Sequence, residues 1–298
     1  MAGDRALDDA ALDDAVREAL AGGTRLGGAE VTAIVTSLGL PGPEPVALAA
    51  VPHAAALADP PISGYRVGVV GLEDGSGDLL LAGNLEFPGA DLTRTVHAEG
   101  AVATRAVLRG TALTAIALHA ARPCAFCRQT LAEFAWAPAI RLIDRLGHVR
   151  GFEELYPWAF VPGALGVPAA GSSAPGDGAW PDLGLDDDRL PRDVAAALLD
   201  AGRHAHAPYS GCPAAVVLRT RDGTLVAGRT LESVAFDPTL GPLQTALVAL
   251  RAGGHGYADL DAAWLASRSG GAVDDVGPTR QLLAAIAPAV PLVTTTWN

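Results

Sequence analysis

The first part of the chain has hydrophobic residues at helical spacing. Leu7, Leu12, Val16 and Leu20 recur between residues 7 and 21, with Asp and Glu at the positions between them. Apolar residues at such intervals lie on one face of a helix. The segment therefore predicts an amphipathic helix with an acidic side that faces solvent.

Farther along, the apolar runs become shorter and predict alternating strands and helices. Residues 65–72 and 79–82 have the pattern of two strands joined by a polar turn that contains glycine. A helix is predicted over 95–108 and a buried strand over 113–118. Pro123 suits a helix start, where its missing N–H costs nothing, and predicts a second helix.

The same order of elements returns in the second half of the chain. A stretch rich in Pro, Gly and Ala, residues 161–191, separates the two halves. Beyond it, Pro208-Tyr209-Ser210 repeats Pro61-Ile62-Ser63, and the apolar runs 214–218 and 224–227 repeat the first pair of strands. The chain is therefore predicted to hold two diverged copies of one unit.

Composition limits the partners and the compartment. With 298 residues the chain exceeds the usual size of one domain, which favours two. Its 21 basic and 33 acidic residues give a net charge of −12, which argues against nucleic acid because phosphate binding needs clustered Lys and Arg. Three cysteines make no disulfide framework, and no apolar segment resembles a signal sequence or a membrane span. We expect a cytoplasmic protein without membrane association.

One motif carries the chemistry. His97-Ala98-Glu99 is followed by Pro123-Cys124-Ala125-Phe126-Cys127, which matches the H-x-E…P-C-x-x-C signature of zinc deaminases. His97, Cys124 and Cys127 supply three ligands, so a fourth tetrahedral position stays open for water, as in catalytic zinc sites. We predict one Zn²⁺ per chain, with Glu99 as the residue that moves protons.

Two other interpretations of the motif remain. A closed structural site would need a fourth protein ligand, for which Cys212, His119 and His148 are the candidates. The motif could also occur by chance, without metal. In the second copy, Pro242-Leu243-Gln244 stands within one residue of the place where His-Ala-Glu is expected, and no cysteine pair follows. That copy is therefore predicted to fold without this zinc site.

The chain resembles the cytidine deaminase family, in its long form with a catalytic half and a degenerate half, over residues 50–298. The resemblance rests on these segments: Ser63-Gly64-Tyr65-Arg66-Val67-Gly68, Asn84-Leu85-Glu86-Phe87, Thr95-Val96-His97-Ala98-Glu99, Pro123-Cys124-Ala125-Phe126-Cys127-Arg128-Gln129, Ala207-Pro208-Tyr209-Ser210, Asp222-Gly223 and Ala235-Phe236-Asp237-Pro238-Thr239-Leu240-Gly241-Pro242-Leu243-Gln244. It implies a homodimer that acts on a small nucleoside.

The resemblance also implies roles for single residues. Asn84 and Glu86 would hydrogen-bond the ribose 3′-hydroxyl, and Tyr65 would pack against the pyrimidine. The Ala98 N–H would meet the carbonyl oxygen of the base, and Glu99 its N3 and amino group. In the long form, the segment that matches Ala235-Phe236 reaches the active site of the partner subunit.

The implied fold is α/β: two copies of an α/β/α cytidine-deaminase-like unit, each with a mixed sheet, after an N-terminal helical segment. The predicted domains are 1–50 (helical segment), 51–156 (catalytic domain), 157–191 (linker) and 192–298 (degenerate, non-catalytic domain).

The expected function is zinc-dependent hydrolytic deamination of cytidine or deoxycytidine, with release of ammonia, in pyrimidine salvage. The sequence departs from the long form at Ala121-Arg122 and at Ala125, where the family usually has Gly. Arg122 could be merely solvated, or could recognise an anionic group on a modified nucleoside or nucleotide. A nucleic-acid editing deaminase and a zinc-stabilised binding protein without activity are the remaining alternatives.

Overall fold

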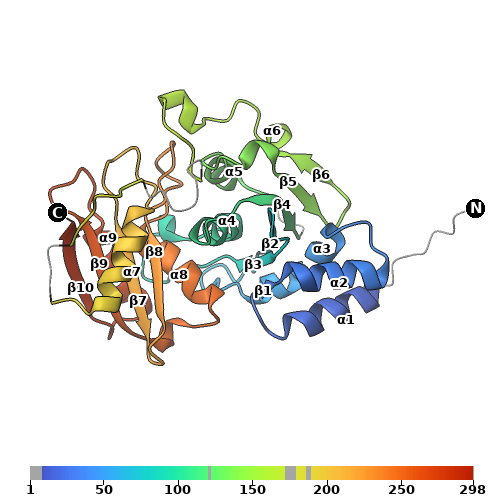
Figure 1. Cartoon of the computed structure of the whole chain (residues 1–298), viewed down its shortest axis with the longest axis horizontal. Coiled ribbons are helices and arrows are strands. Elements are labelled where there is room, and N and C mark those ends of the chain that lie inside the picture. Colours follow the sequence, from blue (N-terminus) through green and yellow to red (C-terminus); the bar gives the residue numbers. More distant parts are fainter. Residues whose placement is uncertain (1–8, 120–121, 172–178, 186–188, 298) are drawn as a thin grey trace, which may run out of the picture.

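The structure is a computed structural model that describes residues 9–119, 122–171, 179–185 and 189–297. Two β-sheets follow one another along an elongated molecule, with helices between them and on their outer sides (Figure 1). Both sheets are mixed and are packed against helices, which confirms the predicted α/β class. Among the described residues, no helix is long and apolar enough to span a membrane.

The first sheet has the strand order β1-β3-β2-β4-β5-β6. Its strands are β1 (Arg25–Leu26), β2 (Gly68–Glu73), β3 (Leu79–Gly83), β4 (Leu113–Leu118), β5 (Arg141–Asp144) and β6 (Val149–Gly151). Strands β2 and β3 are antiparallel, whereas β4 and β5 are parallel. This combination makes the sheet mixed, as predicted.

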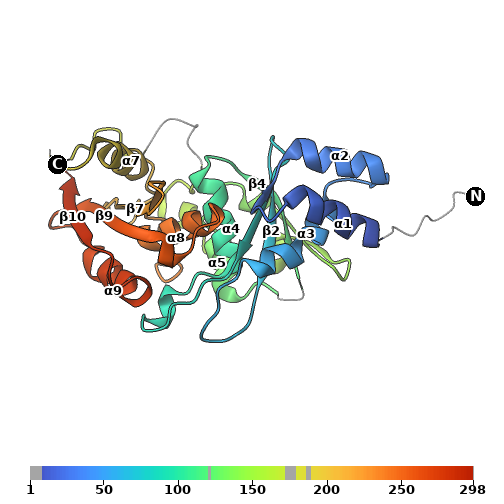
Figure 2. The same ribbon diagram turned by 90° about the horizontal axis from the view of Figure 1, so that it is seen from below.

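Helices cover both faces of the first sheet. They are α1 (Asp9–Leu20), α2 (Gly28–Leu38), α3 (Glu44–Ala56), α4 (Ala98–Leu108), α5 (Ala125–Leu131) and α6 (Phe152–Leu155). Figure 2 shows α1, α2 and α3 on one side of β2 and β4, with α4 and α5 on the other. Successive strand residues point to opposite faces. Val69 and Leu80 accordingly pack with the α4 side, and Val70 and Leu81 with the α3 side.

The second sheet repeats the centre of the first. Its order is β10-β9-β7-β8, with β7 (Ala215–Thr220), β8 (Leu225–Arg229), β9 (Leu260–Arg268) and β10 (Leu292–Trp297). Strand β7 pairs antiparallel with β8 and β9, and β9 pairs parallel with β10, as β2, β3, β4 and β5 do. Both central strands also shift register near their ends, at Leu72/Glu73 and at Arg219/Thr220. These shared features confirm the internal repeat.

The helices of the second copy are α7 (Arg192–Arg203), α8 (Pro242–Ala252) and α9 (Val276–Ile286). Helices α4 and α8 pack against each other between the two sheets. One cluster of buried apolar side chains runs through both copies and includes Val102 of α4 and Leu247 of α8. The Arg229 guanidinium also donates to the Val107 carbonyl at 2.6 Å. The two copies therefore share a core.

The predicted elements exist, but several begin later than the sequence pattern suggested. The strand predicted over 65–72 starts at Gly68, because the Asn84 side chain bonds the backbone of Tyr65 and Val67. The helix predicted from residue 95 starts at Ala98, because Val96 pairs with Leu85 in a β-bridge. The helix predicted from Pro123 starts at Ala125.

The N-terminal region holds more helix than the pattern indicated. Helix α1 begins at Asp9, and Leu7 lies outside the described residues. Helices α2 and α3 were not predicted individually within the helical segment 1–50, and α3 crosses the predicted boundary between residues 50 and 51. In the predicted linker, the described residues include a 3-10 helix, η3 (Pro162–Leu165). The domain boundaries remain predictions.

The second copy contains an acidic residue whose ionisation should oppose folding. Asp275 precedes α9 and is partly buried; burial, followed by the charges of Glu232 and Asp274, raises its pKa to about 6. An unfolded chain releases this proton near pH 4. The folded state therefore binds the proton more tightly, and stability falls as the pH rises from about 4 to about 6.

We therefore expect Asp275→Asn to stabilise the protein above pH 6 but not at pH 4. The gain at pH 7.5 should approach about 3 kcal/mol, since one pKa unit corresponds to about 1.4 kcal/mol. Thermal unfolding at both pH values measures the difference. Asp74→Asn, at an exposed aspartate, is the control and should leave the melting temperature unchanged. Equal stabilisation at pH 4 and pH 7.5 would contradict the expectation.

Candidate metal centre and active site

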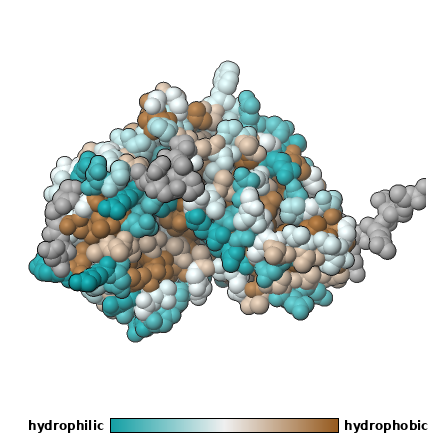
Figure 3. Space-filling model, viewed as in Figure 1, coloured by the Kyte–Doolittle hydropathy of each residue, from teal (hydrophilic) through white to brown (hydrophobic). Residues whose placement is uncertain are grey.

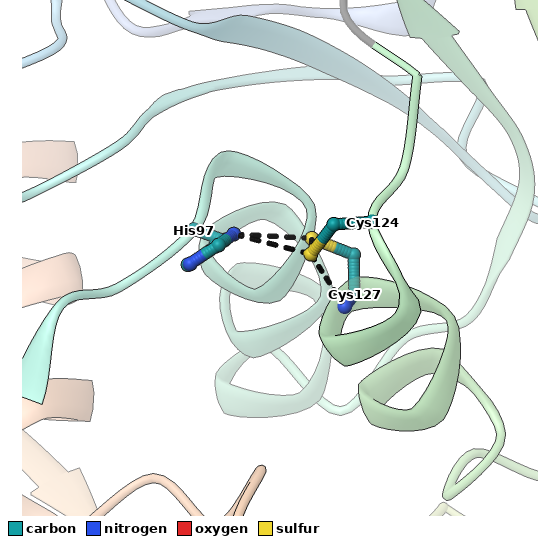
Figure 4. Close-up of side chains that lie close together, drawn as sticks. All are labelled: His97, Cys124 and Cys127. Carbon is teal, nitrogen blue, oxygen red and sulfur yellow. Dashed lines mark hydrogen bonds between the residues drawn. The ribbon is translucent and has the colours of Figure 1, made fainter. Parts of the chain in front are cut away.

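Three side chains converge at the starts of two helices, as Figure 4 shows. His97 Nδ1 lies 3.7 Å from Cys124 Sγ and 3.3 Å from Cys127 Sγ, and the two sulfur atoms are 3.3 Å apart. Among the described residues, these three form the group of His, Cys, Asp or Glu side chains that could hold a metal ion. The predicted ligands are thus brought together.

Local structure explains this convergence. His97 is the N-cap of α4 and Cys124 is the N-cap of α5, while Cys127 lies one turn into α5. The Cys127 N–H donates to Cys124 Sγ at 3.4 Å, so the first turn of α5 holds both sulfur atoms on one side. Helix starts carry free N–H groups and a partial positive charge, which favour thiolate ligands.

The separations fit a tetrahedral zinc ion. With Zn–S bonds near 2.3 Å and Zn–N bonds near 2.0 Å, a tetrahedron requires ligand atoms to lie roughly 3.5 to 3.8 Å apart. The three observed distances of 3.3, 3.3 and 3.7 Å are close to this. Burial, followed by the charge of Glu99, raises the pKa of the Cys127 thiol. A divalent cation at this point would favour the thiolate instead.

Glu99 lies next to the metal ligands without being one of them. It is the second residue of α4, is only 4% exposed, and places Oε2 3.3 Å from Cys127 Sγ. A carboxylate in this position can exchange protons with a molecule bound at the open side of the metal. In this site, His97, Cys124 and Cys127 can therefore hold the metal, and a separate residue, Glu99, can transfer protons.

Three further residues support the site, and the sequence pattern did not reveal their roles. The Phe126 ring stacks on the His97 ring, with centroids 5.4 Å apart. Arg128 donates to the Pro123 and Leu155 carbonyls, and Gln129 donates to the Phe160 carbonyl. Arg128 and Gln129 therefore fasten the end of α6 and the segment after it to α5. In the sequence, Arg128 and Gln129 were marked only by their position directly after Cys127.

The candidates for a fourth protein ligand lie elsewhere. Cys212 is buried in the second copy, where its thiol donates to the Ser210 carbonyl. His148 pairs with Asp144 at 2.8 Å, and His119 is exposed. In the part of the chain that the structure describes, none of them joins the metal-binding group. The geometry therefore favours an open site over a closed structural one.

The residues predicted to bind ribose hold a loop of the catalytic copy. Asn84 accepts from the Val67 N–H and donates to the Tyr65 carbonyl. The Glu86 carboxylate accepts from the Ile62 and Ser63 N–H groups and from the Ser63 hydroxyl. Although burial opposes the shift, these hydrogen bonds keep the pKa of Glu86 below its usual value.

The second copy repeats part of this arrangement without a metal site. The Glu232 carboxylate accepts from the Tyr209 and Ser210 N–H groups, as Glu86 does from Ile62 and Ser63. Since the degenerate copy keeps these bonds, they belong to the fold of the unit. The predicted sugar contacts of Glu86 would therefore be an additional role.

The remaining predicted site residues differ in exposure. Ala98 is buried as the first residue of α4, whereas Tyr65 is exposed. Ala235 and Phe236 lie on an exposed turn of the second copy, and Phe236 has a positive φ of 66°. Arg122 is exposed, and its neighbour Ala121 lies outside the described residues.

Comparison with known proteins identifies the family. Two family models, both described as the zinc-binding region of cytidine and deoxycytidylate deaminases, match residues 45–141 and 182–280. A cytidine deaminase of Shewanella amazonensis is 37% identical over 240 residues, which cover 80% of this chain and 78% of the relative. This chain belongs to the cytidine deaminase family.

Other cytidine deaminases show a similar likeness. The enzyme of Shewanella loihica is 35% identical over 245 residues, covering 80% of this chain and 78% of the relative. The enzyme of Vibrio cholerae is 32% identical over 245 residues, which cover 82% of this chain and 80% of the relative. A solved structure of cytidine deaminase from Burkholderia pseudomallei overlaps 36% of this chain and 85% of its own, at 24% identity and a TM-score of 0.33.

The second family match has a structural explanation. It covers residues 182–280, where Gly241 is the N-cap of α8 and Asp275 the N-cap of α9. In strand order these positions correspond to His97 and Cys124, the N-caps of α4 and α5. In this member of the cytidine deaminase family, the second copy therefore has the same arrangement of strands and helices as the zinc-binding region, but the zinc ligands are replaced by other residues.

Proposed function

We propose that this protein catalyses the zinc-dependent hydrolytic deamination of cytidine or deoxycytidine to the corresponding uridine nucleoside and ammonia. The observation that carries the proposal is the set of three metal ligands with the buried Glu99 carboxylate beside it. Family membership supports the same reaction.

His97, Cys124 and Cys127 would hold Zn²⁺, which would supply an acidified water by lowering its pKa to about 7. Glu99 would accept a proton from the attacking water and deliver protons to N3 and to the departing amino group. Ala98 begins α4, and the first N–H groups of a helix have no partner within it. Its N–H can therefore donate to the carbonyl oxygen of the base.

The sugar contacts can be added to the bonds that Asn84 and Glu86 already make. A carboxylate offers about four lone-pair positions, and Glu86 uses three of them for Ile62 and Ser63. The Asn84 amide donates to the Tyr65 carbonyl and keeps a second N–H. Both side chains thus have the capacity to bond a hydroxyl while they hold the loop. Tyr65 is exposed and free to cover the pyrimidine.

A panel of cytosine and adenine nucleosides and nucleotides, assayed by ammonia release, tests the function. We expect turnover of cytidine and deoxycytidine. Arg122 is exposed, and a preference for a nucleotide that Arg122→Ala abolishes would favour the alternative of an anionic substrate. Absence of turnover by a fully zinc-loaded protein would support the non-catalytic binding protein instead.

We also propose that the protein is a homodimer in which the second copy of each subunit contributes Ala235 and Phe236 to the active site of its partner. The Phe236 ring is 66% exposed and therefore does not fill the core of its own copy. Other large apolar side chains are exposed at Trp158, Phe160 and Leu165. In Figure 3, apolar residues appear at the top of the view, over the segment around η3. Exposed apolar surface of this kind is common at interfaces.

We expect Phe236→Ala to raise KM for cytidine while zinc content and stability stay at wild-type values. The exposed ring contributes contact area at low entropic cost, so its loss should weaken substrate binding without opening a cavity in the fold. Leu146→Ala removes another exposed apolar side chain, from the loop between β5 and β6, and is the control. Sedimentation that shows a fully active monomer would contradict the dimer.

A role in pyrimidine salvage in the cytoplasm is part of the proposal. A metal site with two thiolate ligands, and a third cysteine, Cys212, that is buried as a free thiol, are compatible with a reducing compartment.

A further inference from the structure

A buried carboxylate of the catalytic copy is hydrogen-bonded by three donors of the second copy. Glu133 Oε1 lies 2.6 Å from His206 Nε2 and accepts from the Tyr209 hydroxyl at 2.7 Å. Glu133 Oε2 accepts from the Val234 N–H at 2.7 Å. The four residues, called here the Glu133 clamp, join segments that lie far apart in the sequence.

The burial of Glu133 makes these bonds important. Its side chain is 2% exposed, and a buried carboxylate is costly unless it is hydrogen-bonded or paired. Burial, followed by the hydrogen bond to Glu133, raises the pKa of Tyr209, so its hydroxyl stays a proton donor. The Glu133 carboxylate therefore holds the His206 and Tyr209 side chains and the Val234 backbone in place.

On the side of the second copy, the clamp holds the turn that carries Phe236. Val234 lies two residues before Phe236, and the Tyr209 ring is 6.1 Å from the Phe236 ring. Within the turn, the Phe236 N–H donates to the Ser233 carbonyl and the Thr239 N–H to the Phe236 carbonyl. Phe236 has a φ of 66°, a conformation that a residue other than glycine keeps only when its surroundings fix it.

On the side of the catalytic copy, the clamp residue Glu133 lies just after the C-terminal end of helix α5. Glu133 follows Ala132, the C-cap of α5, whose N-terminal turn carries Cys124 and Cys127. The Glu133 backbone is also fixed, since its carbonyl accepts from the Ala170 N–H at 2.9 Å. The carboxylate is therefore a rigid anchor point for the second copy.

We propose that Glu133 is a positioning residue: through the clamp it fixes the Phe236 turn in the orientation that the active site of the partner subunit requires. The clamp would thus act on catalysis in the other subunit. This inference rests on the proposed dimer, in which Phe236 completes the partner's site.

The mildest test is Tyr209→Phe, which removes one hydroxyl from the clamp and keeps the ring. We expect KM for cytidine to rise about 3- to 10-fold with kcat within about twofold, since a net hydrogen bond amounts to about this factor. Glu133→Gln should give a larger rise. Tyr257→Phe is the matched control, because the Tyr257 hydroxyl is buried without a hydrogen-bond partner among the described residues. It should leave KM unchanged.

Purified heterodimers, made by co-expressing two differently tagged chains, show which subunit the clamp serves. When Tyr209→Phe is on one chain and Glu99→Ala on the other, the only competent site is completed by an intact clamp, so KM should be that of the wild type. When both changes are on one chain and the partner is wild type, the only competent site is completed by the altered clamp, so KM should be raised.

The outcomes separate this inference from the proposed dimer. A raised KM in the first heterodimer and a normal KM in the second would mean that the clamp acts within its own subunit, which overturns the inference. Unchanged KM in every Tyr209→Phe and Glu133→Gln protein, with a raised KM for Phe236→Ala, would overturn the clamp and leave the dimer intact. If Phe236→Ala also leaves KM unchanged, the proposed contribution of Phe236 to the partner's active site fails, and the clamp inference fails with it.

Discussion

Replacing Glu99 with alanine should lower kcat for cytidine by about 100- to 10,000-fold, the usual contribution of a positioned acid–base group. Zinc content should remain at one ion per chain, because Glu99 lies beside the three ligands and is not among them. The loss should appear equally in kcat and kcat/KM, since the proton transfers occur in the transition state.

Steady-state kinetics with metal analysis of the same preparation measures both effects. Glu99→Gln keeps the size of the side chain and removes its basicity, so it should be as inactive as Glu99→Ala. Turnover within about tenfold of the wild type would show that another group transfers the protons.

Replacing Cys127 with alanine should remove zinc and abolish deamination. Two ligands would remain, His97 and Cys124, and catalytic zinc sites use three protein ligands. We also expect a lower melting temperature, because metal binding to the folded state contributes to its stability.

Cys212→Ala is the matched control for this change, since both thiols are buried and only Cys127 lies in the metal-binding group. It should keep zinc and activity, with at most a modest loss of stability from the cavity it opens. Metal analysis, activity and thermal unfolding of both variants decide the question. Loss of zinc in Cys212→Ala would place that thiol in the coordination sphere.

The zinc ligands were predictable because their spacing is short and their chemistry is specific. Cys124 and Cys127 lie on one turn, and His97 and Glu99 begin another helix, so local sequence fixes each pair. The ends of the elements were less predictable. Residues 65–67 have the alternation of a strand, yet the Asn84 side chain binds their backbone and keeps them in a loop.

The Glu133 clamp left no signal in the sequence. Its hydrogen bonds join residues 73, 76 and 101 positions apart, and no periodic pattern connects positions at such distances. His206 also lacks any ligand spacing. Within the predicted helical segment 1–50, the individual helices α2 and α3 were not predicted for a related reason: α3 is apolar nearly all round, so it shows no amphipathic period.

The second copy has a consequence for the order in which the molecule assembles. Gly241 is the N-cap of helix α8, and its N–H donates to the side chain of Gln244 in the first turn. The Gln244 side chain also donates to the Arg94 carbonyl, three residues before His97. In helix α4, its counterpart, the N-cap residue His97 makes no side-chain cap hydrogen bond. The second copy completes its helix start with its own side chains, so we expect it to fold whether or not zinc is present and to be in place before the catalytic copy binds its metal.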